Sequence, residues 1–349
     1  MFLTWYSPIR LTFFVLLIVF VLSPGSVYTK GFEEVDLSLR LPAALSRFSS
    51  YADVAAVGGA SAGSKWASSI NPASITWEKI PGRYHLSLSP QYSIILFDEG
   101  TNLHVTAESI TWDARQFGTI QLALAQGFSN HKTTRQDLKF GYDLDYAQIQ
   151  WARHVTQDWA LGGNFNFAYS KLQFDMGPLE VAKNKGESYD LRIGTLYKAM
   201  DKLLVGLVLD YGVSPGRTTL YDYSGLGPNR IRTKDTTYQF ISRAGASYEY
   251  KKDSAFYFDY QFGWFSNDTG TLRVHRFLTG IDHQVFQPLF IRSGIGLDTK
   301  GNIALTCGIG IYPSKEFSID IGYQFNMFPE LIPEFGRSNL FTISIGIIF

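Results

Sequence analysis

Alternation of apolar and polar residues with a period of two is the feature that most constrains this chain. In residues 341–349, large apolar side chains occupy every second position, and mostly small or polar residues stand between them. The same pattern recurs in four further segments, residues 158–173, 253–265, 301–312 and 316–327. Because successive side chains of a strand point to opposite faces, each segment predicts a strand with one apolar face and one small or polar face.

A soluble β-sandwich would also alternate, so the composition of the two faces has to decide between the folds. The apolar faces carry long runs of large side chains, as in Phe256, Phe258, Tyr260, Phe262 and Trp264. The opposite faces consist mainly of Gly, Ser, Asn, Gln and Asp. The segments are roughly 10–14 residues long, which suits a tilted membrane crossing, whereas strands of soluble proteins average about 5–6 residues. The sequence therefore predicts an all-β fold, an antiparallel transmembrane β-barrel.

We predict fourteen strands in a barrel domain at residues 83–349, and this even number places both ends of that domain on one side of the membrane. The expected strands are 83–97, 101–113, 116–127, 136–153, 158–173, 187–199, 202–212, 236–250, 253–265, 271–282, 286–298, 301–312, 316–327 and 339–349. The longest connections, 174–186, 213–235 and 328–338, all fall on the other side. Bacterial barrels have short periplasmic turns and longer outer loops, so these three segments are predicted to be outer loops.

The first 29 residues predict a secretory signal peptide. Arg10 precedes an apolar run at residues 11–22, and the small residues Ser23, Gly25 and Ser26 follow. A helix of this length would span only about 18 Å, too little for a hydrocarbon core of about 30 Å. An uncleaved membrane anchor is the alternative interpretation. Export of a barrel predicts a multi-pass protein in the outer membrane of a Gram-negative type of cell, with membrane lipid as a partner.

Residues 30–82 lack the alternation and predict a hatch that plugs the lumen. A short helix interrupted by Pro42 is expected within residues 37–48. The tract at residues 55–63 consists almost entirely of Gly, Ala and Ser, which allow backbones to approach closely. The triplet Asn71-Pro72-Ala73 then marks a turn. A disordered periplasmic leader is the alternative.

Composition and motifs argue against several other classes of function. The 31 basic residues balance 31 acidic residues, whereas nucleic-acid binding needs a basic excess. The single cysteine, Cys307, and six scattered histidines offer no spacing typical of metal ligands. Residues 212–216 match the G-x-S-x-G nucleophile pattern, but they open a predicted loop rather than a strand–turn–helix. We therefore expect no enzymatic activity, no metal and no cofactor.

Charged residues on the polar faces are predicted to point into the barrel, where they would form a network between hatch and wall. A pore that selects ions would more often show rings of one sign, and the signs here are mixed. The residues expected to point inward are Asp143, Asp145, Asp190, Arg192, Asp210, Arg243, Glu249, Asp259, Arg292 and Asp320.

The stretch at residues 53–63, the triplet Asn71-Pro72-Ala73 and the barrel behind them resemble the FadL/TodX superfamily of outer-membrane channels for long-chain fatty acids and hydrophobic compounds. In that family the Asn-Pro-Ala motif belongs to a hatch that plugs a fourteen-strand barrel, which implies a gating role for Asn71, Pro72 and Ala73. The ending at Phe349 resembles the signal read by the outer-membrane assembly machinery. The smaller PorV/PorQ-type barrels, associated with protein secretion, share the same motifs.

The function predicted from this resemblance is passive uptake of a hydrophobic or amphipathic small molecule, with secretion or surface attachment of proteins as the alternative. Apolar residues beside arginines in the predicted outer loops suit an amphipathic ligand with a carboxylate. The candidate ligand-contacting residues are Phe174, Met176, Leu179, Leu220, Tyr221, Tyr223, Arg217 and Arg230. The other interpretation is that these loops fold on themselves. Loop 328–338 is expected to cap the same mouth.

Overall fold

The computed structural model describes residues 36–349 except 47, 50, 66, 78–84, 131, 134–138 and 224–228. The predicted signal peptide at residues 1–29 lies outside the described residues.

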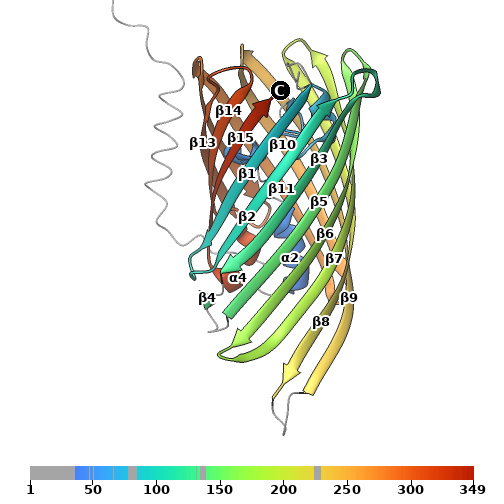
Figure 1. The fold of residues 1–349 in the computed structure, drawn as a ribbon, viewed down its shortest axis with the longest axis vertical. Helices are drawn as coiled ribbons and strands as arrows, with labels where there is room; N and C mark the ends of the chain where they lie inside the picture. Colours follow the sequence, from blue (N-terminus) through green and yellow to red (C-terminus); the bar gives the residue numbers. More distant parts are fainter. Residues whose placement is uncertain are drawn as a thin grey trace, which may run out of the picture.

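Fourteen long antiparallel strands close into a barrel, in which each strand pairs with its neighbours in the sequence (Figure 1). The first and last strands pair with each other, and a two-residue strand, β4 (Lys132–Thr133), pairs only with the start of β5. The long strands are β1 (Leu86–Phe97), β2 (Asn102–Asp113), β3 (Thr119–Asn130), β5 (Lys139–Thr156), β6 (Trp159–Met176), β7 (Leu179–Met200), β8 (Leu203–Asp222), β9 (Asn229–Lys251), β10 (Ser254–Asn267), β11 (Gly270–Phe286), β12 (Leu289–Asp298), β13 (Ile303–Ile311), β14 (Phe317–Phe325) and β15 (Ser338–Ile348).

The outer face of the barrel is apolar, as the alternation predicted. On β8, the exposed side chains Val205, Leu207, Leu209 and Tyr211 alternate with buried residues that face the lumen. Apolar side chains exposed around a closed barrel are typical of contact with lipid. The prediction of a fourteen-strand antiparallel transmembrane barrel is confirmed.

Two of the predicted outer loops, 174–186 and 213–235, are wrong in their extent. Strands β6 and β7 continue to a turn at residues 177–178, and β8 and β9 pair as far as Asp222 and Asn229. These two long hairpins reach beyond the rest of the barrel at the end opposite to the C-terminus (Figure 1). Beyond the membrane both faces of a strand can be polar, so the alternation stops although the backbone pairing continues. We call this the hairpin end of the barrel and the other the C-terminal end.

The third predicted outer loop, 328–338, contains two short helices. They are η3 (Pro329–Leu331) and α4 (Ile332–Phe335), and a further short helix, η2 (Arg115–Phe117), joins β2 to β3 at the C-terminal end. Prolines at the first turns of η3 and α4 fit helix starts, since their missing N–H would have no partner there.

The segment before β1 lies inside the barrel and forms α2 (Leu37–Leu45), α3 (Ala52–Ala56) and η1 (Pro72–Thr76). The Asp36 side chain caps α2 by accepting a hydrogen bond of 2.7 Å from the Ser38 N–H. Pro42 lies inside α2 without ending it. We call residues 36–77 the hatch.

Among the residues that the structure describes, no helix is both long enough and apolar enough to cross a membrane.

Candidate functional site

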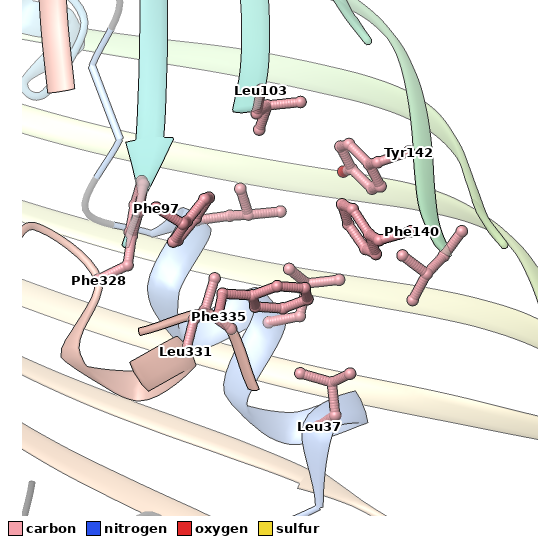
Figure 2. Close-up of a pocket in the computed structure, with 11 residues that line it drawn as sticks. Leu37, Phe97, Leu103, Phe140, Tyr142, Phe328, Leu331 and Phe335 are labelled. Atoms are coloured by element: carbon pink, nitrogen blue, oxygen red, sulfur yellow. The ribbon is translucent and has the colours of Figure 1, made fainter. Parts of the chain in front are cut away.

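An apolar pocket lies at the hairpin end, between the hatch and the barrel wall (Figure 2). The loop at residues 326–337 turns into the barrel there and meets helix α2. The cavity is small, about 30 Å³, and all its lining side chains are aromatic or aliphatic. We call it the mouth pocket; it is lined by Leu37, Leu41, Leu45, Phe97, Leu103, Phe140, Tyr142, Leu172, Phe328, Leu331 and Phe335.

The loop contributes its apolar side chains to the pocket because its backbone is held in tight turns. Gly336 ends α4 with a φ of 75°, a left-handed conformation that favours glycine. Phe335 is thereby placed with its ring centroid 5.4 Å from that of Phe97 on β1 and 4.8 Å from that of Phe140 on β5. Such aromatic pairs add to the burial of apolar area, so they help to hold the loop inside the barrel.

Two ion pairs connect this loop to the hatch and the wall behind the mouth pocket. Arg40 on α2 forms a bidentate pair with the Glu334 carboxylate and also donates a hydrogen bond of 2.9 Å to the backbone oxygen of Glu330. Arg276 on β11 donates 2.7 Å to the Glu330 carboxylate and 2.9 Å to the backbone oxygen of Ala43 in α2. Both arginines and Glu330 are almost fully buried.

The hatch backbone lies against pairs of glycines on the inner wall. Gly162 on β6 is directly opposite Gly194 on β7, and a Cβ atom at either would lie within 2.7 Å of Pro72. On the other side of the barrel, Gly280 and Gly294 form a similar pair, where a Cβ atom would lie within 2.8 Å of Val57. The absence of side chains at these wall positions allows the hatch to pack directly against the strands.

Asn71 is a fully buried junction between two parts of the hatch and the wall. Its Oδ1 accepts a hydrogen bond of 3.0 Å from the Ala73 N–H, which caps η1. Its Nδ2 donates 2.7 Å to the backbone oxygen of Ala62 and 2.9 Å to that of Thr195 on β7. Pro72 begins η1, and its backbone oxygen accepts a hydrogen bond of 3.2 Å from the Gln150 side chain on β5.

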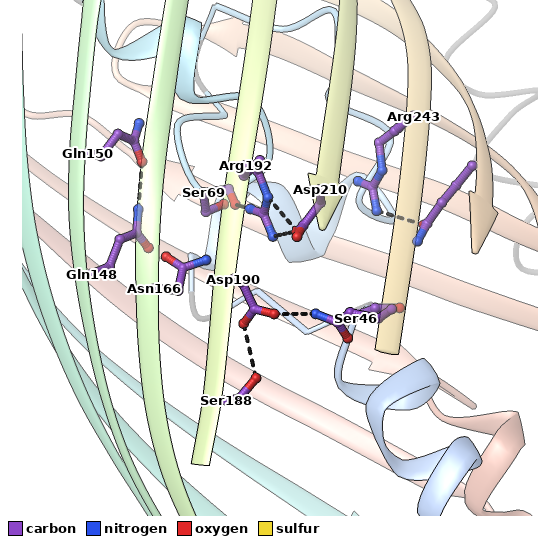
Figure 3. A network of polar contacts seen from close by, with 12 residues as sticks. Ser46, Ser69, Gln148, Gln150, Asn166, Ser188, Asp190, Arg192, Asp210 and Arg243 are labelled. Carbon is purple, nitrogen blue, oxygen red and sulfur yellow. Dashed lines mark hydrogen bonds and ion pairs between the residues drawn. The ribbon is translucent and has the colours of Figure 1, made fainter. Parts of the chain in front are cut away.

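Charged groups of the wall bind the backbone of the hatch at two further places. Arg192 on β7 pairs with Asp210 on β8 at 2.7 Å and donates 2.7 Å to the backbone oxygen of Ser69 (Figure 3). The Asp259 carboxylate on β10 accepts hydrogen bonds of 2.8 and 2.7 Å from the N–H groups of Ser61 and Ala62. These contacts satisfy hatch groups that the lumen would otherwise leave without partners.

Eight of the ten charged residues predicted to point inward do so, and Asp143 and Asp145 do not. Both belong to the outward-facing set of β5, and the Asp143 side chain is 64% exposed beside Lys171, 3.5 Å away. They lie near the hairpin end of β5, where the outward face leaves the apolar belt and becomes polar, so polarity no longer marks the inner face there.

The structure does not bring the predicted ligand-contacting residues together at one site. Phe174 packs against Phe140 at the edge of the mouth pocket, with ring centroids 5.6 Å apart. The others belong to the two long hairpins: Met176 and Leu179 flank the turn between β6 and β7, and Arg217, Leu220, Tyr221, Tyr223 and Arg230 belong to β8, β9 or the connection between them.

Arg217 and Arg230 have positions on the outward face of the hairpins rather than towards the lumen. Arg217 continues the outward-facing set of β8 that contains Tyr211. The Arg230 guanidinium lies 5.6 Å from the ring centre of Tyr221, and the Tyr223 hydroxyl donates 2.7 Å to the backbone oxygen of Glu180. These two contacts lie within and between the hairpins and do not involve the mouth pocket.

From the sequence we assigned to a site neither helix α2 nor the strand residues that line the pocket, Phe97, Leu103, Phe140, Tyr142 and Leu172. For α2 a signal was present. Leu37, Leu41 and Leu45 follow the i, i+4, i+8 spacing of one helix face. That spacing was the available signal, but Pro42 obscured it.

Within the described part of the chain, no three His, Cys, Asp or Glu side chains are grouped closely enough to hold a metal ion. At the C-terminal end, the Phe349 N–H donates 2.9 Å to the backbone oxygen of Leu86, and its side chain is exposed.

No protein-family model matches the sequence, and a search of curated proteins finds no match. Solved structures do match. The structure resembles the Ralstonia pickettii toluene transporter TbuX with a TM-score of 0.62 and 12% identity, covering 86% of this chain and 98% of that one. It resembles the CymD monoaromatic hydrocarbon channel with a TM-score of 0.58 and 15% identity, covering 85% and 97%. A Pseudomonas aeruginosa FadL homologue matches with a TM-score of 0.54 and 13% identity, covering 84% and 96%. The chain therefore has the fold of the FadL/TodX-type barrels.

Proposed function

We propose that this protein is an outer-membrane channel for passive uptake of small hydrophobic molecules. The mouth pocket is the observation that carries the proposal, because it is an apolar binding surface at the end of the barrel that we assign to the cell exterior. The fold is shared with a toluene transporter and a monoaromatic hydrocarbon channel. A molecule that leaves water would first bind among the leucines and phenylalanines of the pocket.

The structure corresponds to a closed state of the proposed channel. A cavity of about 30 Å³ holds little more than water, whereas a benzene ring occupies a cavity of about 150 Å³. A ligand must therefore displace helix α2 or the loop at residues 326–337. A second cavity of about 30 Å³ lies between the hatch and the wall, lined by residues that include Gly58, Arg243 and Gln261. Movement of the hatch would join the two cavities into a path, and we assign control of that movement to Asn71, Pro72 and Ala73.

We also propose the route of export, the location in the outer membrane, the assembly signal and the range of cargo. Export by the segment at residues 1–29, location in the outer membrane and recognition of Phe349 by the assembly machinery are consistent with the barrel and its short connections at the C-terminal end. Long-chain fatty acids, hydrocarbons and other hydrophobic compounds all remain within the proposed cargo of the pocket.

The test is to fill the mouth pocket and measure uptake. Leu41→Trp adds an aromatic ring to the lining, so cells that carry this variant should take up radiolabelled toluene several-fold more slowly than cells with the parent. Leu122→Trp is the matched control, because Leu122 lies on the outward face of β3 and is 53% exposed. Equal uptake by cells with and without the protein would overturn the proposal, and a co-purifying exported protein would then favour secretion.

A further inference from the structure

We infer that the ligand of the mouth pocket is uncharged and that Glu334 excludes carboxylates from it. This inference rests on the proposed function, since it concerns the cargo of the same pocket. It separates hydrocarbons and other neutral compounds from ionised fatty acids, which the apolar lining alone does not do.

Two buried arginines, Arg40 and Arg276, flank the pocket. Arg40 lies between Leu39 and Leu41 on α2, and Leu41 lines the cavity. Arg276 reaches the same helix from the wall through the backbone oxygen of Ala43. A ligand carboxylate that entered beside Leu41 would need one of these guanidinium groups as a partner, because a carboxylate buried without a partner is strongly disfavoured.

Both guanidinium groups already have carboxylate partners from the loop that closes the pocket. Arg40 binds both oxygens of Glu334, and Arg276 binds Glu330 at 2.7 Å. Two positive charges are thus matched by two negative ones. A ligand carboxylate would have to displace a bidentate partner, and the displaced glutamate would remain close to it as a second negative charge.

The two ion pairs and the pocket form together because of the order of the residues in the loop. Glu330 and Glu334 directly precede Leu331 and Phe335, which both line the cavity. The same turns that place Leu331 and Phe335 against the ligand space therefore place the two carboxylates on the arginines. When the loop is closed, its two carboxylates neutralise the two arginines. The closed pocket therefore offers its ligand apolar side chains and no net charge.

Two lysines of the described chain also stand next to lining residues, and both have outward positions. Lys139 precedes Phe140 on β5, and Lys171 precedes Leu172 on β6. Because Phe140 and Leu172 face the lumen, both lysines belong to the opposite face, where Lys139 is exposed and Lys171 pairs with Asp143 at 3.5 Å. They offer no substitute for the two arginines inside the barrel.

The experiment compares two probes that share a ring system, naphthalene and 2-naphthoate. Binding to the full-length protein in detergent is measured at about pH 8, where the carboxylate is ionised, with empty micelles as background. The parent should bind naphthalene and should bind 2-naphthoate at least about tenfold more weakly. Equal affinity of the parent for both probes would overturn the inference but leave the proposed function standing. A parent that binds neither probe would instead contradict the proposed function.

The variant Glu334→Gln tests the residue that we hold responsible. The amide keeps the shape of the side chain but leaves Arg40 without its charge partner, so affinity for 2-naphthoate should rise at least about tenfold while affinity for naphthalene stays unchanged. The matched control Glu187→Gln lies on the outward face of β7 and should match the parent for both probes. The double variant Arg40→Met/Glu334→Gln removes the released cation and should lose the gain. An unchanged ratio of the two affinities in a folded Glu334→Gln barrel would contradict the role of Glu334.

Discussion

The Asn71 side-chain nitrogen lies 2.9 Å from the backbone oxygen of Thr195, so a single amide group of the hatch is bonded to strand β7. The same nitrogen reaches the backbone oxygen of Ala62, which lies in another turn of the hatch. One side chain therefore connects two hatch segments to the wall, and its loss should loosen the hatch without affecting the strands.

Asn71→Ala should leave the barrel folded and weaken docking of the hatch. The barrel strands keep their own backbone hydrogen bonds, whereas the hatch loses the cap of η1 and two donated bonds, about 1–3 kcal/mol of docking free energy. Hydrogen exchange of the hatch amides should accelerate, and uptake of a hydrophobic compound should change. Asn184→Ala, in a strand extension where the side chain bonds Thr218, is the control. Unchanged uptake of every compound tried, with a normally folded barrel, would contradict the gating role of Asn71.

Adjacent glycines on β6 should respond differently to the same substitution. In Gly162→Ala the new methyl group would lie 2.6 Å from the carbonyl carbon of Pro72, so the hatch must shift at an expected cost of about 1–3 kcal/mol. In Gly163→Ala the nearest atom is 3.5 Å away, an ordinary contact. Limited proteolysis should release hatch fragments faster from Gly162→Ala than from Gly163→Ala. Equal rates would show that the hatch does not rest on this part of the wall.

Docking of the hatch should weaken as the pH rises towards neutrality because of Asp53. Asp53 lies on α3 inside the lumen, where burial, followed by the negative charge of Asp320, raises its pKa from 3.8 to about 7, and Arg292 partly opposes this effect. The docked hatch therefore binds this proton more tightly than the released hatch. The resulting stabilisation is complete below about pH 4 and is lost as the pH rises through about 7.

Hydrogen exchange of the hatch amides between about pH 4 and pH 8, corrected for the intrinsic pH dependence of exchange, measures this effect. Asp53→Asn should remove most of the dependence and protect the hatch more than the parent does near pH 8. Asp158→Asn, in the exposed turn between β5 and β6, should retain the pH dependence of the parent. A parent hatch that docks equally well across this range would contradict the assignment to Asp53.

Removal of Phe349 should reduce insertion of the barrel into the outer membrane. The Phe349 side chain is exposed and its N–H pairs with Leu86, so deletion removes one edge contact but no core packing. If insertion falls by more than the loss of this one contact explains, the result indicates that the assembly machinery recognises the terminal aromatic side chain. Heat-modifiable gel mobility of membrane fractions measures insertion, with Phe349→Tyr as the variant that keeps an aromatic end. Normal insertion of the deletion variant would count against an assembly signal at Phe349.

Alternation, together with the composition of the two faces of each strand, predicted the barrel from the sequence alone. On β8, Val205, Leu207 and Leu209 lie on one face of the strand, and Gly206 and Asp210 lie on the other. Because successive side chains point to opposite faces, the apolar residues face the lipid when the small and polar residues face the lumen. The number of strands followed from the same pattern. The inward glycines could also be predicted from their places on the small or polar faces, although their contacts with the hatch could not.

Tertiary structure decided the rest, because the remaining features depend on residues far apart in the sequence. Arg40 and Glu334 are separated by 294 positions, and their pairing requires a closed barrel that brings α2 and the last outer loop to one mouth. Backbone pairing holds the hairpin extensions of β7 and β8. Where both faces of a strand are polar, the sequence shows no alternation from which this pairing could be predicted. Short-range periodicity therefore determined which segments are strands, and long-range packing determined which side chains surround the pocket.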